Sequence, residues 1–398
     1  MNKQTLAIDI PFQKSDAYGA LSMPVYHTCA YEFADATVMA DAFCGRIEEP
    51  DYSRVMNPTV TFLEQKVKAI TGAERVTALS SGMAAISNIL LSLVEAGRNV
   101  VTSRHMFGNT FSLLTNTLPR LGVKAHLCDL TNLDEVEKAV DDDTCCIFLE
   151  TITNPQLEVA DLPALARIAH SHGIPLVADT TVIPFTEFSA KALGVDIEVV
   201  STTKYLSGGA TTIGGMVIDY GGHPEFARRL HDEMLFNLGA YMTPHVAYMQ
   251  NLGLENLKAR YTMQSANTIE LAKRLKTLPG IRAVNYVGLP DNRFHEIAMR
   301  QFGGTAGCMF TIDLDSKVAC FRFINRLKLI RRATNLFDNR TLAIHPASTI
   351  FGPFSDEQRR AMDVLDTTIR ISVGLESVDD LFEDFRQAPV SYTHLTLP

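Results

Sequence analysis

The stretch "RVTALSSGMAAISNILLSLVEAG", residues 75–97, reads as a short strand that leads directly into a helix. Its first five residues form a compact, partly β-branched run, whereas apolar residues after Gly82 recur at the three- and four-residue spacing of a helix. Glycine at the junction eases the turn between the two elements. A strand followed at once by a helix is the repeating unit of a parallel α/β sheet.

Five more short apolar runs follow, separated by helical patterns. They are "NVVTS" (99–103), "KAHLCDL" (124–130), "CCIFLET" (145–151), "IPLVADT" (174–180) and "IEVVSTT" (197–203). Strands that alternate with helices join through right-handed crossovers. The sequence therefore predicts an α/β fold with a mostly parallel central sheet.

The sequence divides into four parts. Residues 1–56 show no sustained periodicity and predict an extended arm with turns, and residues 57–244 hold the large strand–helix domain. A long amphipathic pattern over residues 245–280 predicts one long helix, which opens a smaller C-terminal α/β domain spanning 245–388. Residues 389–398 are polar and β-branched without helical periodicity, and we assign them no function.

Composition and charge limit the classes of function. The 398 residues are 46% hydrophobic and 20% charged, which is typical of a globular enzyme. The net charge is −9 and no basic block stands out, so we expect no nucleic-acid groove. The start lacks the apolar core of a signal peptide, no apolar run could span a membrane, and the seven scattered cysteines suit a reducing compartment. We therefore expect a soluble cytoplasmic protein, without a metal site, that acts on small molecules.

A candidate phosphate site lies at the start of the first helix. Ser81, Gly82 and Met83 occupy the turn from strand to helix. The free N–H groups and the positive dipole end of a helix start attract anions. The alternative is an ordinary serine-capped helix with glycine at the turn, and these three residues alone do not decide between the two.

Two charged residues lie at the ends of other predicted strands. Asp179 closes "IPLVADT", and Lys204 follows "IEVVSTT", with Ser201 and Thr203 beside it. Taken singly, Asp179 could be a turn cap and Lys204 a surface lysine. Ligands of open parallel sheets, however, bind at the carboxyl ends of the strands. An acid, a lysine and a phosphate cradle are thus expected at one edge of the sheet.

Pyridoxal 5'-phosphate (PLP) needs these three groups. Its aldehyde condenses with a lysine amine, its ring nitrogen stays protonated beside a carboxylate, and its phosphate takes hydroxyl and N–H donors. A free lysine has a pKa of ~10.4, and condensation removes the cost of burying its charge. We therefore predict that Lys204 holds PLP and moves protons.

The order of motifs resembles the Cys/Met-metabolism family of PLP enzymes, which includes cystathionine γ-synthase, cystathionine and methionine γ-lyases and the O-acylhomoserine sulfhydrylases. The resemblance runs from "MPVYHTCAYEF" (23–33) to "SVDDLFEDFRQA" (377–388). The motifs between them are "YSRVMNPT", "SSGMAAI", "ETITNPQLEV", "VADTT", "STTKYLSGG", "TLAIHPAST" and "IRISVGLE". The resemblance implies the aspartate-aminotransferase-like fold, fold type I.

The resemblance also implies roles for residues in these motifs. Tyr52 and Arg54 would reach across a dimer interface to the phosphate of the neighbouring subunit's cofactor, within a homotetramer of two such dimers. Asn154, supported by Glu150, would bond the phenolic oxygen of PLP, and Arg370 would grip the α-carboxylate of an amino-acid substrate. The plainer alternatives are exposed arm residues and an edge-strand arginine. The remaining implied cofactor contacts are Ser81, Gly82, Met83, Phe107, Asp179, Ser201, Thr203 and Lys204.

Several positions depart from the commonest family pattern. Phe107 replaces a tyrosine that stacks on the cofactor ring, so stacking survives but a phenolic proton is lost. Thr180 replaces an asparagine, and "TIF" replaces "TTH" after "HPAS". Asn109 stands where methionine γ-lyases carry a cysteine. Asn335, at a position that is serine in lyases and cystathionine synthases, resembles the sulfhydrylases and is a predicted substrate contact.

These departures favour an O-acylhomoserine sulfhydrylase. Such an enzyme replaces the acyl group, here expected to be O-acetyl, by sulfide or a thiol and gives homocysteine or methionine. Lys204, Asp179 and Phe107 are the predicted catalytic residues. The alternatives are a cystathionine γ-synthase or a cystathionine or methionine γ-lyase and, more remotely, a non-catalytic PLP-binding protein. The acyl group, the sulfur nucleophile and the balance of replacement against elimination stay open.

Overall fold

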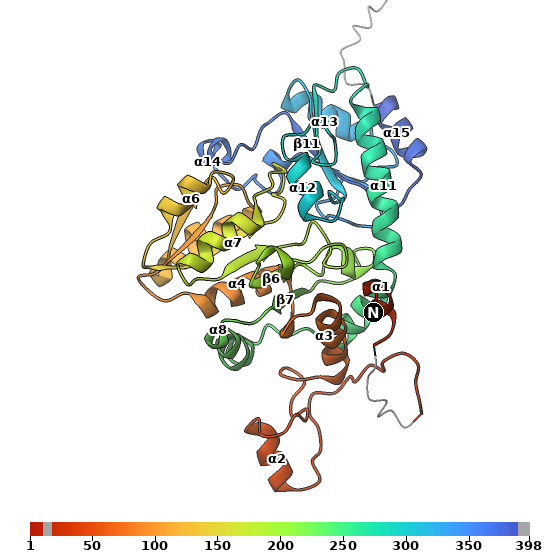
Figure 1. Ribbon diagram of the computed structural model, residues 1–398. Helices are drawn as coiled ribbons and strands as arrows, with labels where there is room; N and C mark the ends of the chain where they lie inside the picture. The colour runs from red at the N-terminus through yellow and green to blue at the C-terminus, as the bar shows by residue number, and fades with distance from the viewer. Residues whose placement is uncertain (11–17, 389–398) are drawn as a thin grey trace, which may run out of the picture.

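A seven-stranded sheet forms the centre of the computed structural model, which describes residues 1–10 and 18–388 (Figure 1). Neighbouring strands from β6 to β3 are parallel, whereas β7 is antiparallel to both β6 and β1. The predicted mostly parallel sheet is confirmed. In spatial order the strands are β1 (Arg75–Leu79), β7 (Gly215–Asp219), β6 (Ile197–Val200), β5 (Leu176–Asp179), β4 (Thr144–Glu150), β2 (Asn99–Ser103) and β3 (Lys124–Cys128).

The six strands predicted for this sheet are all present, but β7 was not predicted. It follows a segment of small and hydroxyl residues rather than a helix, so no alternation of strand and helix marks it in the sequence. Burial on both faces explains why the inner strands are rich in apolar residues, whereas β3, at the edge, is partly exposed. In β4, Cys146 and Phe148 belong to one core cluster, and Ile147 and Leu149 belong to the other.

Helices pack on both faces of the central sheet. The α-helices of the described chain are α1 (Lys3–Ile8), α2 (Ala36–Phe43), α3 (Pro58–Thr71), α4 (Gly82–Leu93), α5 (Gly108–Ser112), α6 (Leu133–Ala139), α7 (Leu162–Ser171), α8 (Pro224–Arg228), α9 (Phe236–Leu238), α10 (Pro244–Glu255), α11 (Leu257–Leu275), α12 (His295–Gln301), α13 (Lys317–Arg326), α14 (Asp356–Ala361) and α15 (Val378–Gln387). α3, α6 and α7 bury one face of the sheet, and α4 and α8 bury the other.

A second sheet forms the C-terminal part of the molecule, at the end where α12, α13 and α15 lie in Figure 1. Its strands are all antiparallel. In order they are β10 (Leu342–Ile344), β11 (Thr368–Ser372), β9 (Met309–Asp313) and β8 (Ala283–Asn285). The division into domains at residues 57 and 245 stays our proposal, and the predicted tail, 389–398, lies outside the described residues.

Two expectations about helices are wrong. The pattern over residues 245–280 is not one helix, because the chain breaks at Asn256 between α10 and α11. The side chain of Asn256 accepts a hydrogen bond from Arg260 Nε at 2.5 Å, which holds the break. Residues 1–56 are not wholly extended either, since α1 packs against α3 and α10, and α2 forms within the arm.

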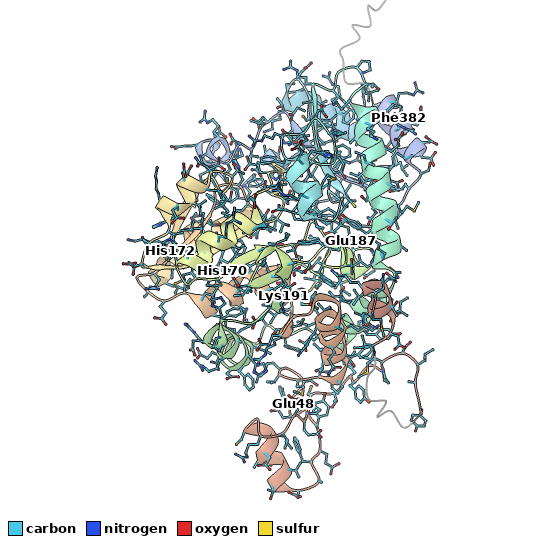
Figure 2. The ribbon with its side chains drawn as sticks, viewed as in Figure 1. Glu48, His170, His172, Glu187, Lys191 and Phe382 are labelled. Atoms are coloured by element: carbon cyan, nitrogen blue, oxygen red, sulfur yellow. The ribbon has the colours of Figure 1, made fainter. Side chains whose placement is uncertain are left out.

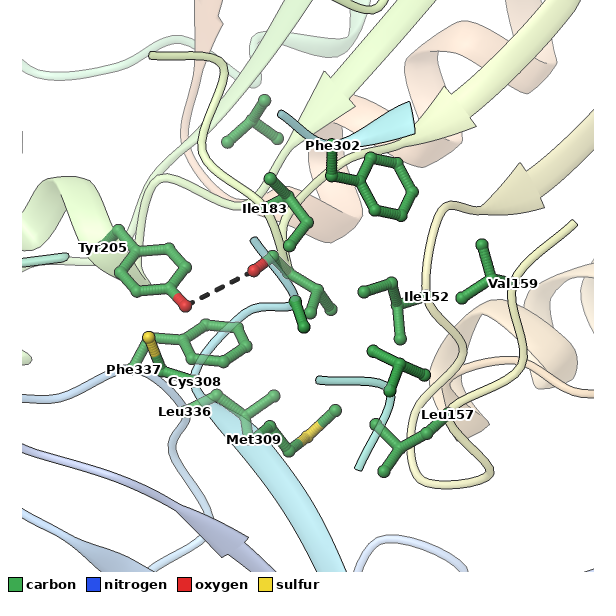
Figure 3. Packing of buried hydrophobic residues seen from close by; sticks show 14 of the residues in the cluster. Ile152, Leu157, Val159, Ile183, Tyr205, Phe302, Cys308, Met309, Leu336 and Phe337 are labelled. Carbon is green, nitrogen blue, oxygen red and sulfur yellow. Dashed lines mark hydrogen bonds between the residues drawn. The ribbon is translucent and has the colours of Figure 1, made fainter. Parts of the chain in front are cut away.

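One hydrophobic core joins the two sheets (Figure 3). Ile183 and Tyr205, from the central-sheet side, pack beside Phe302, Met309 and Phe337 of the C-terminal part. The Tyr205 ring stacks on Phe337 with centroids 4.3 Å apart. This shared core fixes the C-terminal part against the edge of the sheet where the strands end.

The arm that carries α2 projects from the opposite end of the molecule (Figure 1). Glu48, on this arm, lies between α2 and the main body (Figure 2). Several large apolar side chains of the arm are exposed, among them Leu21 at 88% and Phe43 at 63%. Among the helices of residues 1–10 and 18–388, none combines the length and the apolar character needed to cross a membrane.

Candidate active site

A cavity of about 360 Å³ lies where the parallel strands of the central sheet end. The predicted site residues that line it are Ser81, Gly82, Met83, Phe107, Asn154, Asp179, Ser201, Thr203, Lys204, Asn335 and Arg370. Glu150 lines it as well. The structure thus brings together residues that lie up to 289 positions apart, from Ser81 to Arg370.

The cavity wall also contains residues that the sequence analysis missed. They are Ile86, Ile152, Thr181, Val182, Thr334, Leu336 and Ile350. Several were within reach of sequence reasoning, since Thr181 and Val182 directly follow Asp179 and Thr334 and Leu336 flank Asn335. Ile350 had a weaker signal, as it belongs to the "TIF" segment that departs from the family pattern.

The start of α4 forms one wall of the cavity. Ser81 Oγ accepts the N–H of Ala84 at 3.0 Å, as a helix cap does. The first N–H groups of a helix have no acceptor within it, so those of Gly82 and Met83 are available to an anion. A β-carbon on Gly82 would lie 2.7 Å from Ser201 Cβ, so only glycine lets the helix start approach Ser201 this closely.

Asp179 lies at the end of β5 with its carboxyl group at the cavity. Its Oδ1 accepts the N–H of Thr181 at 2.9 Å, and Thr181 Oγ1 in turn accepts the N–H of Ser201 at 2.8 Å. Burial raises the pKa of Asp179, although the hydrogen bonds from Thr181 and the charge of Lys204 oppose this. A carboxylate under this desolvation gains from a cationic or N–H partner.

Lys204 begins the turn after β6, and its amine lies in the cavity. Lys204 Nζ donates to Asn335 Oδ1 at 2.8 Å. Burial and the nearby charge of Arg370 lower the pKa of Lys204 to about 8, against the opposing charge of Asp179. A substantial neutral fraction of the amine is therefore present near neutral pH, which a nucleophile or base requires.

Glu150, at the end of β4, holds two cavity residues in place. Its Oε1 accepts the N–H of Phe107 at 2.6 Å, and its Oε2 accepts the N–H of Asn154 at 3.1 Å. Burial, together with the charge of Asp179, raises the pKa of Glu150 to about 8. One carboxyl group thus fixes the backbone beneath both the Phe107 ring and the Asn154 amide.

Arg370, on β11, is 2% exposed and reaches the cavity from the second sheet. Its Nη1 donates to Asn154 Oδ1 at 3.1 Å and its Nη2 donates to the carbonyl of Thr334 at 3.0 Å, but its Nε has no partner. Burial lowers the pKa of Arg370 to about 9. A buried guanidinium with a free N–H suits an incoming carboxylate.

Four singled-out residues do not line the cavity. Thr180 is buried and donates to Glu198 Oε1 at 2.5 Å, and Asn109 is exposed on α5. Tyr52 and Arg54 belong to the arm, where Arg54 Nη1 donates to the carbonyl of Phe236 at 2.6 Å. In the described part of the chain, no cluster of three or more side chains could hold a metal ion.

Comparison with known proteins gives concordant results. The family model "Cys/Met metabolism PLP-dependent enzyme" matches residues 4–389. An L-methionine γ-lyase from Fusobacterium nucleatum subsp. polymorphum is 36% identical, with 93% of each chain covered. An O-succinylhomoserine sulfhydrylase from Pseudomonas aeruginosa is 35% identical over 94% of this chain and 91% of its own.

A solved structure extends the similarity to the fold. A protein from Campylobacter jejuni, described as an O-acetylhomoserine (thiol)-lyase and carrying a pyridoxyl-lysine phosphate, matches with a TM-score of 0.94 and 32% identity over 98% of this chain and 99% of that chain. These matches confirm the resemblance seen in the motifs and the fold type I architecture. The chain belongs to the Cys/Met-metabolism family of PLP-dependent enzymes, and PLP is its cofactor.

Proposed function

We propose that the protein catalyses γ-replacement on an O-acyl-L-homoserine, with O-acetyl as the first candidate, by sulfide or a thiol to give homocysteine or methionine. The observation that carries this proposal is the composition of the cavity wall. Among the described residues that line it there is no tyrosine, cysteine or histidine, and Phe107 stands where a phenol could have been. Glu150 also lines the cavity with a pKa of about 8, but both of its oxygens accept backbone N–H groups, so Lys204 is the principal proton carrier of the wall.

Leaving-group chemistry links this wall to an acyl substrate. A carboxylate leaving group is the base of an acid with a pKa of about 4, and it departs without a proton. A thiolate leaving group, as in methionine or cystathionine, is the base of a thiol with a pKa of about 8.5 or higher and departs readily only when it is protonated. A cavity without a phenol or a thiol thus suits the O-acyl substrate better.

The cavity residues fit PLP as the family assignment requires. We assign the phosphate to the start of α4 with Ser201 and Thr203, the phenolic oxygen to Asn154, and the ring nitrogen to Asp179. The close approach of Gly82 to Ser201 and the unpaired Nε of buried Arg370 support a cavity built for two anionic groups, a phosphate and a substrate carboxylate. When bound, PLP withdraws electrons from the Cα and Cβ of the amino acid.

The side chains of the cavity have separate roles in binding the substrate, moving protons and excluding water. Arg370 holds the α-carboxylate through its guanidinium, and Asn335 lies close enough to Lys204 to orient the amine. Lys204 takes the proton from Cα and moves a second proton at Cβ, since its lowered pKa allows both gain and loss near neutral pH. The apolar wall, including Phe107 and Ile350, excludes water from the reacting carbons.

Elimination is the second candidate, favoured by the similarity to L-methionine γ-lyases at 36% identity. A cystathionine or methionine γ-lyase would use the same lysine, aspartate and arginine for elimination, and a cystathionine γ-synthase, another alternative, would use them for replacement by the thiol of cysteine. The reactions diverge on whether a thiol reaches Cγ before 2-oxobutanoate and ammonia are released. A protein that binds PLP without catalysis is only a remote third candidate, because the lysine, aspartate and arginine that catalysis needs all line the cavity.

With O-acetylhomoserine and sulfide, we expect the enzyme to form homocysteine faster than 2-oxobutanoate, and methionine alone to yield little 2-oxobutanoate. Quantifying both products by chromatography checks this, with O-succinylhomoserine run in parallel to compare acyl groups. Phe107→Tyr is the matched variant, because it restores a phenolic proton and should raise elimination from methionine relative to wild type. Rapid 2-oxobutanoate release from methionine by the wild-type enzyme, unaffected by sulfide, would favour a γ-lyase instead.

We further propose that the arm completes the site of a second subunit, within a cytoplasmic homotetramer of two dimers. Tyr52 and Arg54 lie outside the cavity of their own chain, and Tyr52 is 43% exposed. The exposed apolar side chains of the arm are typical of a surface that another chain covers. All seven cysteines are unpaired, as a reducing compartment would keep them.

Arg54→Ala should weaken both PLP retention and the dimer, because one charged contact would serve both. Removing the partner of a buried phosphate costs roughly 2–5 kcal/mol in such a setting. Sedimentation velocity and PLP content, measured on the same sample, check this. Arg46→Ala is the control, since Arg46 lies on the same arm and pairs only locally with Asp41. An Arg54→Ala protein with normal PLP content and an intact oligomer would contradict the bridging role.

A further inference from the structure

A buried histidine lies behind the cavity wall, two residues before Phe107. His105 is 7% exposed. Its Nδ1 lies 2.5 Å from Glu158 Oε2, and its Nε2 lies 2.9 Å from Asp363 Oδ2. The second oxygen of Glu158 accepts from Arg293 Nη2 at 2.7 Å. We call His105, Glu158, Asp363 and Arg293 the His105 cluster.

The geometry of the cluster fixes the charge of the histidine. Both ring nitrogens face carboxylate oxygens, which can only accept hydrogen bonds when ionised. A neutral imidazole has one donor, so only the imidazolium donates to both Glu158 and Asp363. Burial lowers the pKa of His105, but the two carboxylates outweigh it and raise that pKa above its usual value. The other charged groups around the ring are Asp129, Arg104 and Arg293.

The cluster joins segments that carry cavity residues. His105 shares the loop between β2 and α5 with Phe107, and Glu158 shares the loop between β4 and α7 with Asn154. Asp363 follows α14, in the C-terminal part of the chain. A single side chain thus links two loops of the central sheet to a distant segment.

Two further contacts join the same loops of the central sheet to residues 350–363, and we call this contact region the seam. Gln156 Nε2 donates to the carbonyl of Met362 at 2.6 Å. Gly108 lies against Ile350, where a β-carbon on Gly108 would be 2.9 Å from the Ile350 carbonyl oxygen. Because Ile350 lines the cavity, the seam lies directly behind the cavity wall. The segment after α14 contacts the loop of Phe107 through Asp363 and His105, so a shift of this segment would move the part of the wall that Phe107 forms.

We propose that His105 is a positioning residue for the PLP-dependent reaction: as an imidazolium it ties the Phe107 loop to the segment after α14 and thereby fixes the Phe107 ring at the cavity wall. The proposal rests on the family assignment and not on which γ-substrate is used. The His105 cluster then makes kcat/KM depend on pH in a way that does not come from ionisation of the reacting groups.

The sign of this dependence follows from the cluster. Below the ordinary histidine pKa of about 6.5, the imidazolium is fully formed and both contacts are present. As the pH rises through the raised pKa of His105, the ring loses a proton and one carboxylate loses its donor. Asp363 is the partner that separates, because its side chain is 70% exposed and water can replace the contact. The positioning effect is thus lost on the alkaline side.

Asp363→Asn tests the proposal with little disturbance of the fold. Asp363 has a φ of 52°, in the left-handed region that asparagine tolerates as well as aspartate does. At about pH 6.5, we expect kcat/KM about 3- to 10-fold below wild type, because the asparagine oxygen still accepts from His105 Nε2 but a neutral hydrogen bond replaces a charge-assisted one. As the pH rises through the raised pKa of His105, the ratio of wild type to variant should fall toward 1. Glu357→Gln, on α14, is the control and should match wild type at every pH.

A second measurement needs no substrate. The visible circular-dichroism band of bound PLP reports the surroundings of its ring, so wild type and Asp363→Asn should differ at the lower pH and converge as the pH rises, at equal PLP content. His105→Gln should show the low kcat/KM at every pH. A wild-type to Asp363→Asn ratio near 1 at the lower pH, or one that stays constant with pH, would overturn the proposal. Since the band is recorded without substrate, failure of the sulfhydrylase assignment leaves this test intact.

Discussion

Lys204→Ala should abolish turnover and leave a protein that cannot attach PLP covalently. Lys204 carries the one amine among the described residues that line the cavity, and its lowered pKa of about 8 makes that amine reactive near neutral pH. We expect a loss on the order of 10⁴-fold or more, because proton transfer by a positioned group alone contributes about 10²- to 10⁴-fold and attachment is lost as well.

Borohydride reduction followed by peptide mass analysis measures the attachment directly. The wild-type peptide that contains Lys204 should gain a pyridoxyl phosphate group, and the variant peptide should not. Lys204→Arg keeps a positive charge but should also fail, because a guanidinium does not deprotonate near neutral pH. Lys191→Ala is the matched control, as Lys191 lies on the surface (Figure 2) and contacts only the Gly72 carbonyl and the Tyr220 ring. Turnover at the wild-type rate by Lys204→Ala would remove the lysine from the mechanism.

The sequence predicts the central sheet well because each buried strand is a short apolar run and each helix has its own periodicity. β7 and the break at Asn256 show the limits of that reasoning. An antiparallel strand after a loop of small residues interrupts the alternation, and a single asparagine ends α10 through side-chain contacts that no local pattern records. Propensity and period describe regular structure, whereas β7 depends on pairing with β1 and β6 and the break at Asn256 depends on a side-chain hydrogen bond from Arg260.

The candidate site likewise contains some residues that the sequence predicts and others that it does not. Ser81, Asp179 and Lys204 could be predicted because strand ends of a parallel sheet meet at one edge, so their position along the chain already places them. Arg370 and Asn335 reach the cavity from the second part of the chain, and only the family resemblance linked them to it. The His105 cluster had no signal at all, because Glu158 and Asp363 lie 53 and 258 positions away from His105.

Asp179→Asn is the second substitution with a large expected effect. Asparagine still accepts the N–H of Thr181 through its side-chain oxygen, so the turn after β5 should survive. It removes, however, the negative charge that we assign to the protonated ring nitrogen of PLP. Electrostatic stabilisation of developing charge in a buried site is typically worth about 10²- to 10³-fold in rate, and we expect kcat to fall by that amount with PLP still bound.

A matched substitution separates this role from a structural one. Asp219, at the end of β7, accepts the N–H of Gly221 at 2.8 Å in the same local arrangement that Asp179 forms with Thr181. Asp219 does not line the cavity, so Asp219→Asn should leave kcat close to wild type. Measuring kcat, PLP content and melting temperature for both variants gives the comparison. If the two substitutions had equally small effects on kcat, Asp179 would be only a turn cap, and the charge that keeps the ring nitrogen protonated would have to come from elsewhere. A large loss confined to Asp179→Asn, at unchanged melting temperature, would instead mean that the carboxylate acts on the cofactor, because the shared turn geometry cannot account for the difference.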